Sequence, residues 1–376
     1  MNYSNSALLM AGFTLLSVSS ALAQAAETQL KMSGFASVGV NHVSNDSGYF
    51  LATDSGLHYK SDSLFGFKFD FDVNDKVDAS VQLLSRGDNN WSNDVEWAYL
   101  SYAITPATKI RGGKLRLPLF IYSDFLDARF SLPWVRPPQE VYSVIPTSGY
   151  SGVELNYEQA VGDFNFTAQV YLGEAEPEEL VSGATSKLTQ LRGTTLSLAG
   201  ENLMLRVSYA TADIDLTLGT GSAIPAGLYQ GDASFIGLGA LYDDGSWLAV
   251  AEIVRAEIDT QDMSEISSVY LTLGRRFNDW MPYLTYARAR NASDFPDVLA
   301  QQFLEAKRQT LSVGLRWDLA RGMSLKSELS RLFSFEGSRG LLRNNSIPLY
   351  SNGQLSGFSI PHDSVFVSSV SLDVIF

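Results

Sequence analysis

The chain has 376 residues, of which 45% are hydrophobic and 18% are charged, and it contains no cysteine. Its formal net charge of −14 argues against a nucleic-acid partner, because phosphate backbones are bound by basic surfaces. The absence of cysteine excludes a disulfide framework, so stability must come from a large sheet or from a membrane.

The first element is an uncharged apolar run from Ala7 to Ala23 that ends in the small-residue motif Ala21-Leu22-Ala23. Such a run before an A-x-A motif is typical of a secretory signal peptide. We expect residues 1–25 to be this signal, cleaved near 23–25, and residues 26–376 to form a single domain. An N-terminal membrane anchor is the alternative, which the shortness of the run and its Ser and Ala content disfavour.

Apolar and polar residues alternate with period two along most of the remaining chain, which predicts β-strands. In "LFGFKFDFDV" (64–73), for example, the four phenylalanines face one way while Lys68 and Asp70 face the other. Sixteen segments follow this pattern, at about 33–43, 63–73, 77–86, 94–104, 108–116, 149–158, 163–172, 190–198, 202–211, 234–242, 246–256, 264–276, 280–290, 308–317, 322–333 and 363–376. Most span about 9–11 residues, which suits a tilted transmembrane strand better than a soluble one of about 5–6 residues.

The connections between these segments alternate strictly between short turns and longer loops. The short turns are at 74–76, 105–107, 159–162, 199–201, 243–245, 277–279 and 318–321. The longer loops are at 44–62, 87–93, 117–148, 173–189, 212–233, 257–263, 291–307 and 334–362. This asymmetry is typical of transmembrane barrels, so we predict an all-β, antiparallel transmembrane β-barrel of about sixteen strands. A barrel of this width encloses water, which favours a channel.

The last predicted strand, "SVFVSSVSLDVIF", ends in Phe376. A final strand with a terminal phenylalanine resembles the ending of Gram-negative outer-membrane proteins, in which the barrel-assembly machinery reads it. Together with the export signal, the acidic charge and the loop asymmetry, the whole mature chain resembles the Gram-negative general porins. The resemblance implies an outer-membrane location, contact with the lipid bilayer and lipopolysaccharide, assembly as a homotrimer, and no cofactor.

In the porin family the third external loop folds into the barrel, and its acidic residues face basic residues of the opposite wall. The third long loop here is 117–148, with two arginines among its charges; this mixture leaves the sign of selectivity open. The resemblance assigns the acids Asp124, Asp127 and Glu140 to the constriction, where Arg129 and Arg136 of the same loop also lie and depart from its acidic pattern. Basic candidates at inward strand positions are Lys68, Arg86, Lys109, Arg111, Arg206, Arg316 and Lys326.

The composition of this loop also favours an inward position. Four prolines between residues 118 and 138 restrict its backbone, and its dense apolar and aromatic residues require burial, which the inner wall offers. We expect a short helix through about Phe130, capped by Ser123 with Asp124 and Asp127 in its first turn. An outward loop that packs on the surface or binds a partner is the alternative.

We therefore expect a passive diffusion channel for small hydrophilic solutes and ions. The alternatives are a substrate-preferring porin for sugars or organic acids, with Phe120, Tyr122, Phe125, Phe130 and Trp134 as an aromatic contact, or a surface-exposed binding or structural barrel with a blocked lumen.

No serine has a recognisable nucleophile setting and no nucleotide or zinc motif occurs, so neither an enzyme nor a metal site is expected. We interpret the three histidines, His42, His58 and His362, as solvated loop residues. The acids of 174–179 read as a solvated charge run, with binding of divalent cations left open.

Overall fold

A computed structural model of the chain describes residues 29–48, 55–145, 147–176, 184–218, 227–259, 265–291, 307–340, 342, 345, 347–352 and 354–376. The predicted signal peptide, residues 1–25, lies outside these described residues. So do parts of several long loops, including residues 177–179 of the acidic segment.

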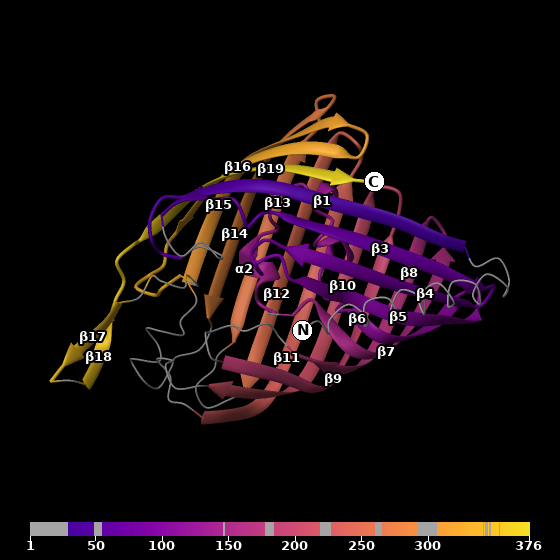
Figure 1. Cartoon of the computed structure of the whole chain (residues 1–376), viewed down its shortest axis with the longest axis horizontal. Coiled ribbons are helices and arrows are strands. Elements are labelled where there is room, and N and C mark those ends of the chain that lie inside the picture. The colour runs from indigo at the N-terminus through magenta and orange to yellow at the C-terminus, as the bar shows by residue number, and fades with distance from the viewer. Residues whose placement is uncertain are drawn as a thin grey trace, which may run out of the picture.

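Sixteen strands of the described residues form one closed antiparallel barrel, in which each strand pairs with its neighbours along the chain (Figure 1). They are β1 (Gln29–Val43), β3 (Leu64–Asn74), β4 (Val77–Arg86), β5 (Asn93–Thr105), β6 (Thr108–Arg116), β7 (Gly149–Val161), β8 (Phe164–Ala175), β9 (Ala184–Ala199), β10 (Leu203–Leu218), β11 (Gly227–Asp243), β12 (Trp247–Asp259), β13 (Ile266–Arg275), β14 (Trp280–Asn291), β15 (Lys307–Ala320), β16 (Met323–Phe333) and β19 (Ser364–Ile375). All sixteen predicted strands are confirmed, and so is the fold class.

The barrel closes by pairing β19 with β1 in a register that runs from Phe35↔Ile375 to Val43↔Val367. Phe376 extends this seam by one residue: its backbone N–H donates to the Gly34 carbonyl (2.9 Å), and the Gly34 N–H donates to the Phe376 carbonyl (2.8 Å). Closure removes the unpaired strand edges that a lipid environment does not tolerate.

Several strands are longer than predicted, chiefly at the end that carries the long loops. The pairing of β10 with β11 continues without interruption to Leu218↔Gly227, past the predicted end of the strand at about residue 211. Polar residues such as Asp213 and Asp215 mask the alternation there. Backbone pairing continues because these residues lie where the wall meets a polar environment rather than lipid.

The two faces of the wall differ as the alternation predicts. Outward apolar side chains remain exposed, such as Val153 on β7 (49%) and Leu284 on β14 (47%). Inward positions carry buried polar residues, such as Ser80, Thr285 and Ser371. An apolar exterior around a polar interior is the arrangement of a membrane barrel.

The described loops contain a few short elements. They are β2 (Gly56–His58), the 3₁₀ turns η1 (Ser123–Phe125) and η2 (Arg129–Ser131), α2 (Gln139–Tyr142), and a hairpin of β17 (Ile347–Ser351) and β18 (Gln354–Ser359) that projects beyond the barrel rim (Figure 1). No helix within the described residues has the length and apolarity needed to cross a membrane.

Candidate functional site: the inward loop and the lumen wall

The loop 117–148 lies against the inner wall of the barrel. Its first part contacts β9 and β12: the Thr195 hydroxyl donates to the Pro118 carbonyl (2.8 Å), and the Ile121 N–H donates to Glu252 Oε2 (2.9 Å). Both wall residues are inward polar positions of long strands. The loop backbone therefore forms hydrogen bonds with polar wall side chains that would otherwise be exposed to water in the lumen.

The expected helix through Phe130 does not form. The segment instead makes two separate 3₁₀ turns, η1 and η2, and neither has a side-chain cap. The Ser123 hydroxyl accepts from the Phe120 N–H (2.9 Å), which closes the turn before η1 rather than capping a helix after it. Contacts with the wall on several sides outweigh the local tendency to form a helix.

Aromatic packing holds the middle of the loop to the wall. The Trp134 ring meets Tyr270 of β13 edge to face with centroids 5.5 Å apart, and Phe120 meets Phe235 of β11 in the same way at 5.6 Å. The buried cluster includes Leu117, Leu119, Phe120, Ile121, Tyr122, Leu132, Trp134, Val141 and Tyr142 of the loop. Burial of this kind stabilises by roughly 1.5–3 kcal/mol for each large side chain.

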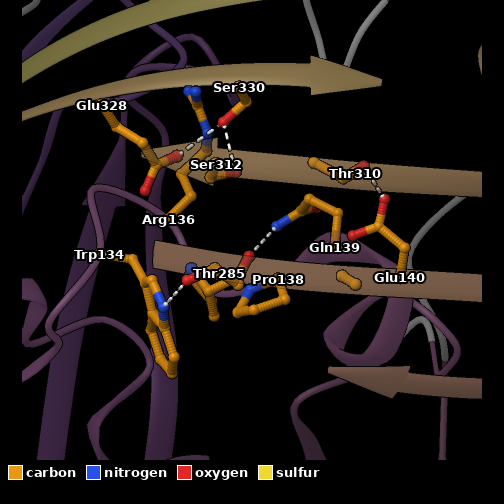
Figure 2. A pocket seen from close by; sticks show the side chains of 12 residues that line it. Trp134, Arg136, Pro138, Gln139, Glu140, Thr285, Thr310, Ser312, Glu328 and Ser330 are labelled. Carbon is orange, nitrogen blue, oxygen red and sulfur yellow. Dashed lines mark hydrogen bonds between the residues drawn. The ribbon is translucent and has the colours of Figure 1, made fainter. Parts of the chain in front are cut away.

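The buried Trp134 indole also has a polar partner on the wall. Its Nε1–H donates to Thr272 Oγ1 (2.8 Å) and to Thr285 Oγ1 (3.1 Å). Figure 2 shows the contact of Trp134 with Thr285 at one side of a small cavity between the loop and strands β14 to β16, which Arg136 and Glu140 of the loop also line.

A buried ion-pair cluster joins this loop to the first long loop. The Asp62 side chain is fully buried and accepts from Arg136 Nη1 (2.5 Å) and Arg129 Nη1 (3.3 Å). Asn41 Nδ2 donates to the same carboxylate (2.7 Å). Burial alone raises the pKa of Asp62, but the Arg136 and Arg129 guanidiniums outweigh it and keep the pKa below its ordinary value.

Gly39 makes room for this cluster. A Cβ atom at position 39 would lie 2.3 Å from the Asp62 Cβ, so a larger residue on β1 would push the first loop away from the wall. Arg136 Nη2 also donates to Ser369 Oγ on β19 (2.6 Å). The cluster therefore ties both loops to the barrel seam.

A second cluster surrounds Asp127. Its carboxylate accepts from Arg86 Nη2 of β4 (2.9 Å) and from Arg116 of β6, and both arginines also contact Glu96. Burial raises the pKa of Asp127, but the two guanidiniums more than offset this and lower the pKa to about 2. Asp127 is therefore charged at neutral pH and fixed to the wall.

A third set of contacts fixes the end of the loop and its carbonyl groups. Glu140 accepts from Arg308 Nε (2.6 Å) and from the Thr310 hydroxyl (2.5 Å) on β15. Lys326 of β16 is fully buried beside Asp373 (3.0 Å), and its Nζ donates to the carbonyls of Arg129 (2.6 Å) and Trp134 (3.0 Å).

These contacts correct the expected roles of most constriction residues. Among the loop charges, Asp127, Arg129, Arg136 and Glu140 are buried at 9% exposure or less, so they bind the wall instead of facing a solute. Four basic wall residues also hold the loop: Arg86 pairs with Asp127, while Arg206, Arg316 and Lys326 donate to loop carbonyls, and Lys326 pairs in addition with Asp373 of β19. The expected aromatic contact is likewise reduced, because Phe120, Tyr122 and Trp134 are buried.

The remaining predicted residues lie on a part of the lumen that the loop leaves partly open. Asp124 is exposed on η1, and its neighbour Phe125 is 51% exposed. On the neighbouring wall, Glu154 of β7 pairs with Arg111 Nη1 (3.2 Å) on β6.

Further along this open wall, Lys68 pairs with Asp70 (3.0 Å) and Lys109 with Asp78 (3.7 Å). All four side chains are 34–46% exposed. Water and solutes can therefore reach charges of both signs here.

Several important residues were missed by the sequence reasoning. Asp62, Glu96, Arg116, Glu252, Arg308 and Asp373 all take part in holding the loop. Arg308 and Asp373 occupy inward positions in the alternating pattern of their strands, so the pattern alone predicts that they face the lumen. Asp62 lies in a loop without a pattern, and no signal marked it.

The described residues contain no group of three His, Asp or Glu side chains arranged to hold a metal ion. In the acidic segment, Glu174 pairs with Lys187 across β8 and β9 (3.0 Å). The rest of that segment falls largely in the part of the chain that is not described.

A family model described as Gram-negative porin matches residues 10–334. A sequence comparison with curated proteins finds no match to the chain. Among solved structures, an anion-selective porin from Comamonas acidovorans has a TM-score of 0.61 at 16% identity, over 93% of this chain and 100% of that one.

Two further solved structures have a similar likeness. The outer-membrane channel DcaP of Acinetobacter baumannii has a TM-score of 0.60 at 12% identity, over 93% of this chain and 97% of that one. In-vitro folded OmpT of Vibrio cholerae, described in a trimer form, has a TM-score of 0.59 at 11% identity, over 93% of this chain and 99% of that one. At these identities the likeness shows the fold, while the family match covers most of the chain. The chain belongs to the Gram-negative porin family and is an outer-membrane β-barrel channel for passive diffusion.

Proposed function

We propose that solutes cross the barrel beside the inward loop, between Asp124 and Phe125 on one side and the β5 to β7 wall on the other. The loop sets the size limit and the charges across the gap set the selectivity. No chemical step is involved, and we infer that the protein is not an enzyme. The observation that carries the proposal is that the loop buries one face on the wall and leaves Asp124 and Phe125 exposed.

The charges that face this gap support a transverse field. We place Arg111 across the gap from Asp124; it is half-buried, and its Cζ lies 5.6 Å from the Tyr99 ring centroid. A carboxylate and a guanidinium on opposite sides of a narrow aqueous passage create a local field. Because Glu154 offsets part of the Arg111 charge, we expect only weak selectivity between anions and cations.

Single-channel recording in a planar bilayer tests this proposal. Asp124→Asn should shift the reversal potential in a salt gradient toward anion preference, and Arg111→Gln should shift it toward cation preference. Asp232→Asn is the matched control, since it removes the same charge at an exposed position of β11 that points outward. Equal reversal potentials in all three variants would place the path elsewhere, and folded protein without conductance would overturn the proposal.

A preference for aromatic solutes is the second candidate, and the exposed Phe125 ring favours it. An apolar ring at 51% exposure inside an aqueous lumen offers a stacking surface. Micromolar to millimolar aromatic acids should then block the current reversibly, and Phe125→Ala should remove the block while leaving small-ion conductance intact. Block that persists in this variant would contradict the preference.

We also propose that Phe376 serves as the signal for the barrel-assembly machinery. Its ring packs against Phe67 with centroids 6.0 Å apart, and it fills the space above Gly34, where a Cβ would meet the ring at 2.5 Å. Phe376→Ser should lower the yield of folded barrel in cells. The same variant refolded in detergent separates signalling from packing: normal refolding with a low cellular yield supports a signal.

Assembly as a homotrimer and contact with lipopolysaccharide complete the proposal. The trimer form of the Vibrio cholerae protein with the same fold supports the first. Cross-linking in native membranes should give a three-subunit band, and a single-subunit band would contradict it. Residues 1–25 are proposed as the cleaved export signal, which N-terminal sequencing of the mature protein would test.

A further inference from the structure

The last long loop begins with a segment that folds onto the inner wall at the long-loop end of the barrel. We call its described residues, 334–340 with Leu342 and Asn345, the loop base. Phe335 and Leu342 are at most 2% exposed and pack against four inward side chains of the neighbouring strands, which are Val43, Leu332, Val365 and Val367. Burial of these apolar side chains holds the loop base in place, so it is a second segment that covers the wall from the inside.

Two glycines of the loop base have a positive φ but different surroundings. Gly337 (φ +82°) and Gly340 (φ +69°) both lie in the left-handed region, which glycine adopts without a steric cost. A Cβ atom at position 340 would lie 2.6 Å from a ring carbon of Phe335, whereas a Cβ atom at position 337 would meet no described atom within 4 Å. Gly340 therefore forms the seat of the Phe335 ring, while Gly337 only turns the chain.

Hydrogen bonds close the loop base and tie it to β15. The buried Ser338 hydroxyl accepts from the Lys307 N–H (3.3 Å) and from the Gly340 N–H (3.2 Å). The buried Asn345 side chain joins the two ends of the long loop: its Nδ2 donates to the His362 carbonyl (2.9 Å), and its Oδ1 accepts from the His362 N–H (3.1 Å). The projecting hairpin of β17 and β18 lies beyond this closure, so the contacts of the loop base do not depend on the hairpin.

Arg308 of β15 connects the loop base to the inward loop 117–148. Its Nη1 donates to the Gly340 carbonyl (3.3 Å), and its Nε donates to Glu140 Oε1 (2.6 Å). The Arg308 side chain is 4% exposed, and a guanidinium holds all its donors in one rigid plane. The position of the Gly340 carbonyl therefore affects the orientation of the guanidinium that Glu140 binds.

We propose that the loop base positions the inward loop through Arg308, so that the last long loop helps to set the width of the passage. Phe335 and Gly340 act as positioning residues, because they fix the carbonyl that orients Arg308 toward Glu140. Glu140 also accepts from the Thr310 hydroxyl, so a shift of the loop base weakens the attachment of α2 without abolishing it. The inference rests on the proposed path beside the inward loop.

Gly340→Ala and Gly337→Ala form a matched pair of variants that tests the proposal. Both add one methyl group at a left-handed backbone position and carry the same kind of local strain, but only Gly340→Ala displaces the Phe335 ring. Single-channel recording of the purified barrel measures the fraction of time spent at noisy current levels. In Gly340→Ala this fraction should increase roughly two- to tenfold, the range expected when a hydrogen bond to a charged group is weakened. Gly337→Ala should have the noise of wild type.

A double-mutant cycle shows whether the effect passes through Glu140. Glu140→Gln alone should raise the noise, and adding Gly340→Ala to it should then raise the noise little further, because the coupled contact is already weakened. Equal increments in both backgrounds, or wild-type noise in Gly340→Ala, would overturn the proposal. If Gly340→Ala does not fold, as heat modification on gels would show, Phe335→Ala loosens the same seat and takes its place in the cycle. Absence of current through the folded wild-type barrel would instead contradict the proposed channel path, so the two failures are distinguishable.

Discussion

The inner wall of the barrel has two unlike sides. Along β9 to β14 the loop covers the wall, and the inward side chains there include small and apolar residues such as Ala210, Val250 and Ala287, all buried. Toward the short-turn ends of β3, β4 and β6 the inward pairs Lys68–Asp70 and Lys109–Asp78 remain partly exposed, whereas the loop covers Arg86 and Arg116 farther along β4 and β6. Both sides show the same alternation along their strands. The difference therefore depends on what covers the wall, not on strand pattern.

Charges are used differently on the two sides. Beneath and beside the loop, pairs such as Asp62 with Arg136 and Glu140 with Arg308 are at most 4% exposed. Breaking a buried pair by removing one partner costs roughly 3–5 kcal/mol, because the other charge is left without compensation. An exposed pair contributes only about 0–1 kcal/mol. The covered charges thus fix the loop, and the open charges are left to act on solutes.

Deleting residues 120–139 should have the largest effect on this contrast, because it uncovers the apolar wall and removes the inward loop. We expect conductance to rise at least about twofold, since a sixteen-stranded barrel without an inward loop encloses a wide aqueous lumen. Single-channel recording measures this, together with the size limit for uncharged solutes. Removing residues 347–359, the hairpin beyond the rim, is the control and should leave conductance unchanged. Unchanged conductance after deletion of residues 120–139 would contradict the loop's role as a constriction.

Asp62→Ala should have the next largest effect, because it leaves Arg129 and Arg136 buried without their carboxylate. The expected loss is roughly 3–5 kcal/mol of loop anchoring, visible as a lower temperature of heat modification on gels and as added noise in the open-channel current. The heat-modification temperature and current noise of Asp62→Asn should lie between those of wild type and Asp62→Ala, because asparagine keeps a hydrogen-bond acceptor but not the charge. Quiet, wild-type current in the alanine variant would show that the other contacts suffice.

The strand pattern was predictable from the sequence, whereas the pairing of charges was not. A period of two separates lipid-facing from inward residues, and a loop such as 117–148 stands out by its prolines and aromatic residues. The pattern does not tell which inward charges meet the loop. Asp127 and Asp124 are three residues apart on the same loop, yet one is buried between two arginines and the other is exposed.

The partners of the loop charges come from distant parts of the chain. Asp62 pairs with Arg136 across 74 positions, and Glu140 with Arg308 across 168. Such pairs depend on the closure of the barrel and on the height of each residue on the wall, and a single sequence gives neither. This is why the fold was predicted well and the individual roles of the site residues were not.

Acid should loosen the attachment of the loop to β4 and β6 by a smaller amount and over a defined pH range, because Asp127 pairs there with Arg86 and Arg116. The folded-state pKa of Asp127 is lowered to about 2, below the ordinary value of about 3.9. Its contribution to loop anchoring is therefore complete above about pH 4 and is lost as the pH falls toward 2. Conductance noise recorded from pH 7 to pH 2 should be constant at first and increase below about pH 4. Asp127→Asn should show higher noise at neutral pH and a weaker pH dependence, and an identical profile would place the acid response elsewhere.

The smallest effect is expected on the open side, where Asp78→Ala removes the partner of Lys109. Both side chains are more than a third exposed and their nearest atoms lie 3.7 Å apart, so the change in stability should be about 0–1 kcal/mol. Water solvates the freed ammonium, and no buried charge is created. The heat-modification temperature should remain that of wild type, while the reversal potential should shift slightly toward anion preference, because one lumen carboxylate is gone. A loss of stability as large as that of Asp62→Ala would mean that the two sides of the wall do not differ in the way their burial indicates.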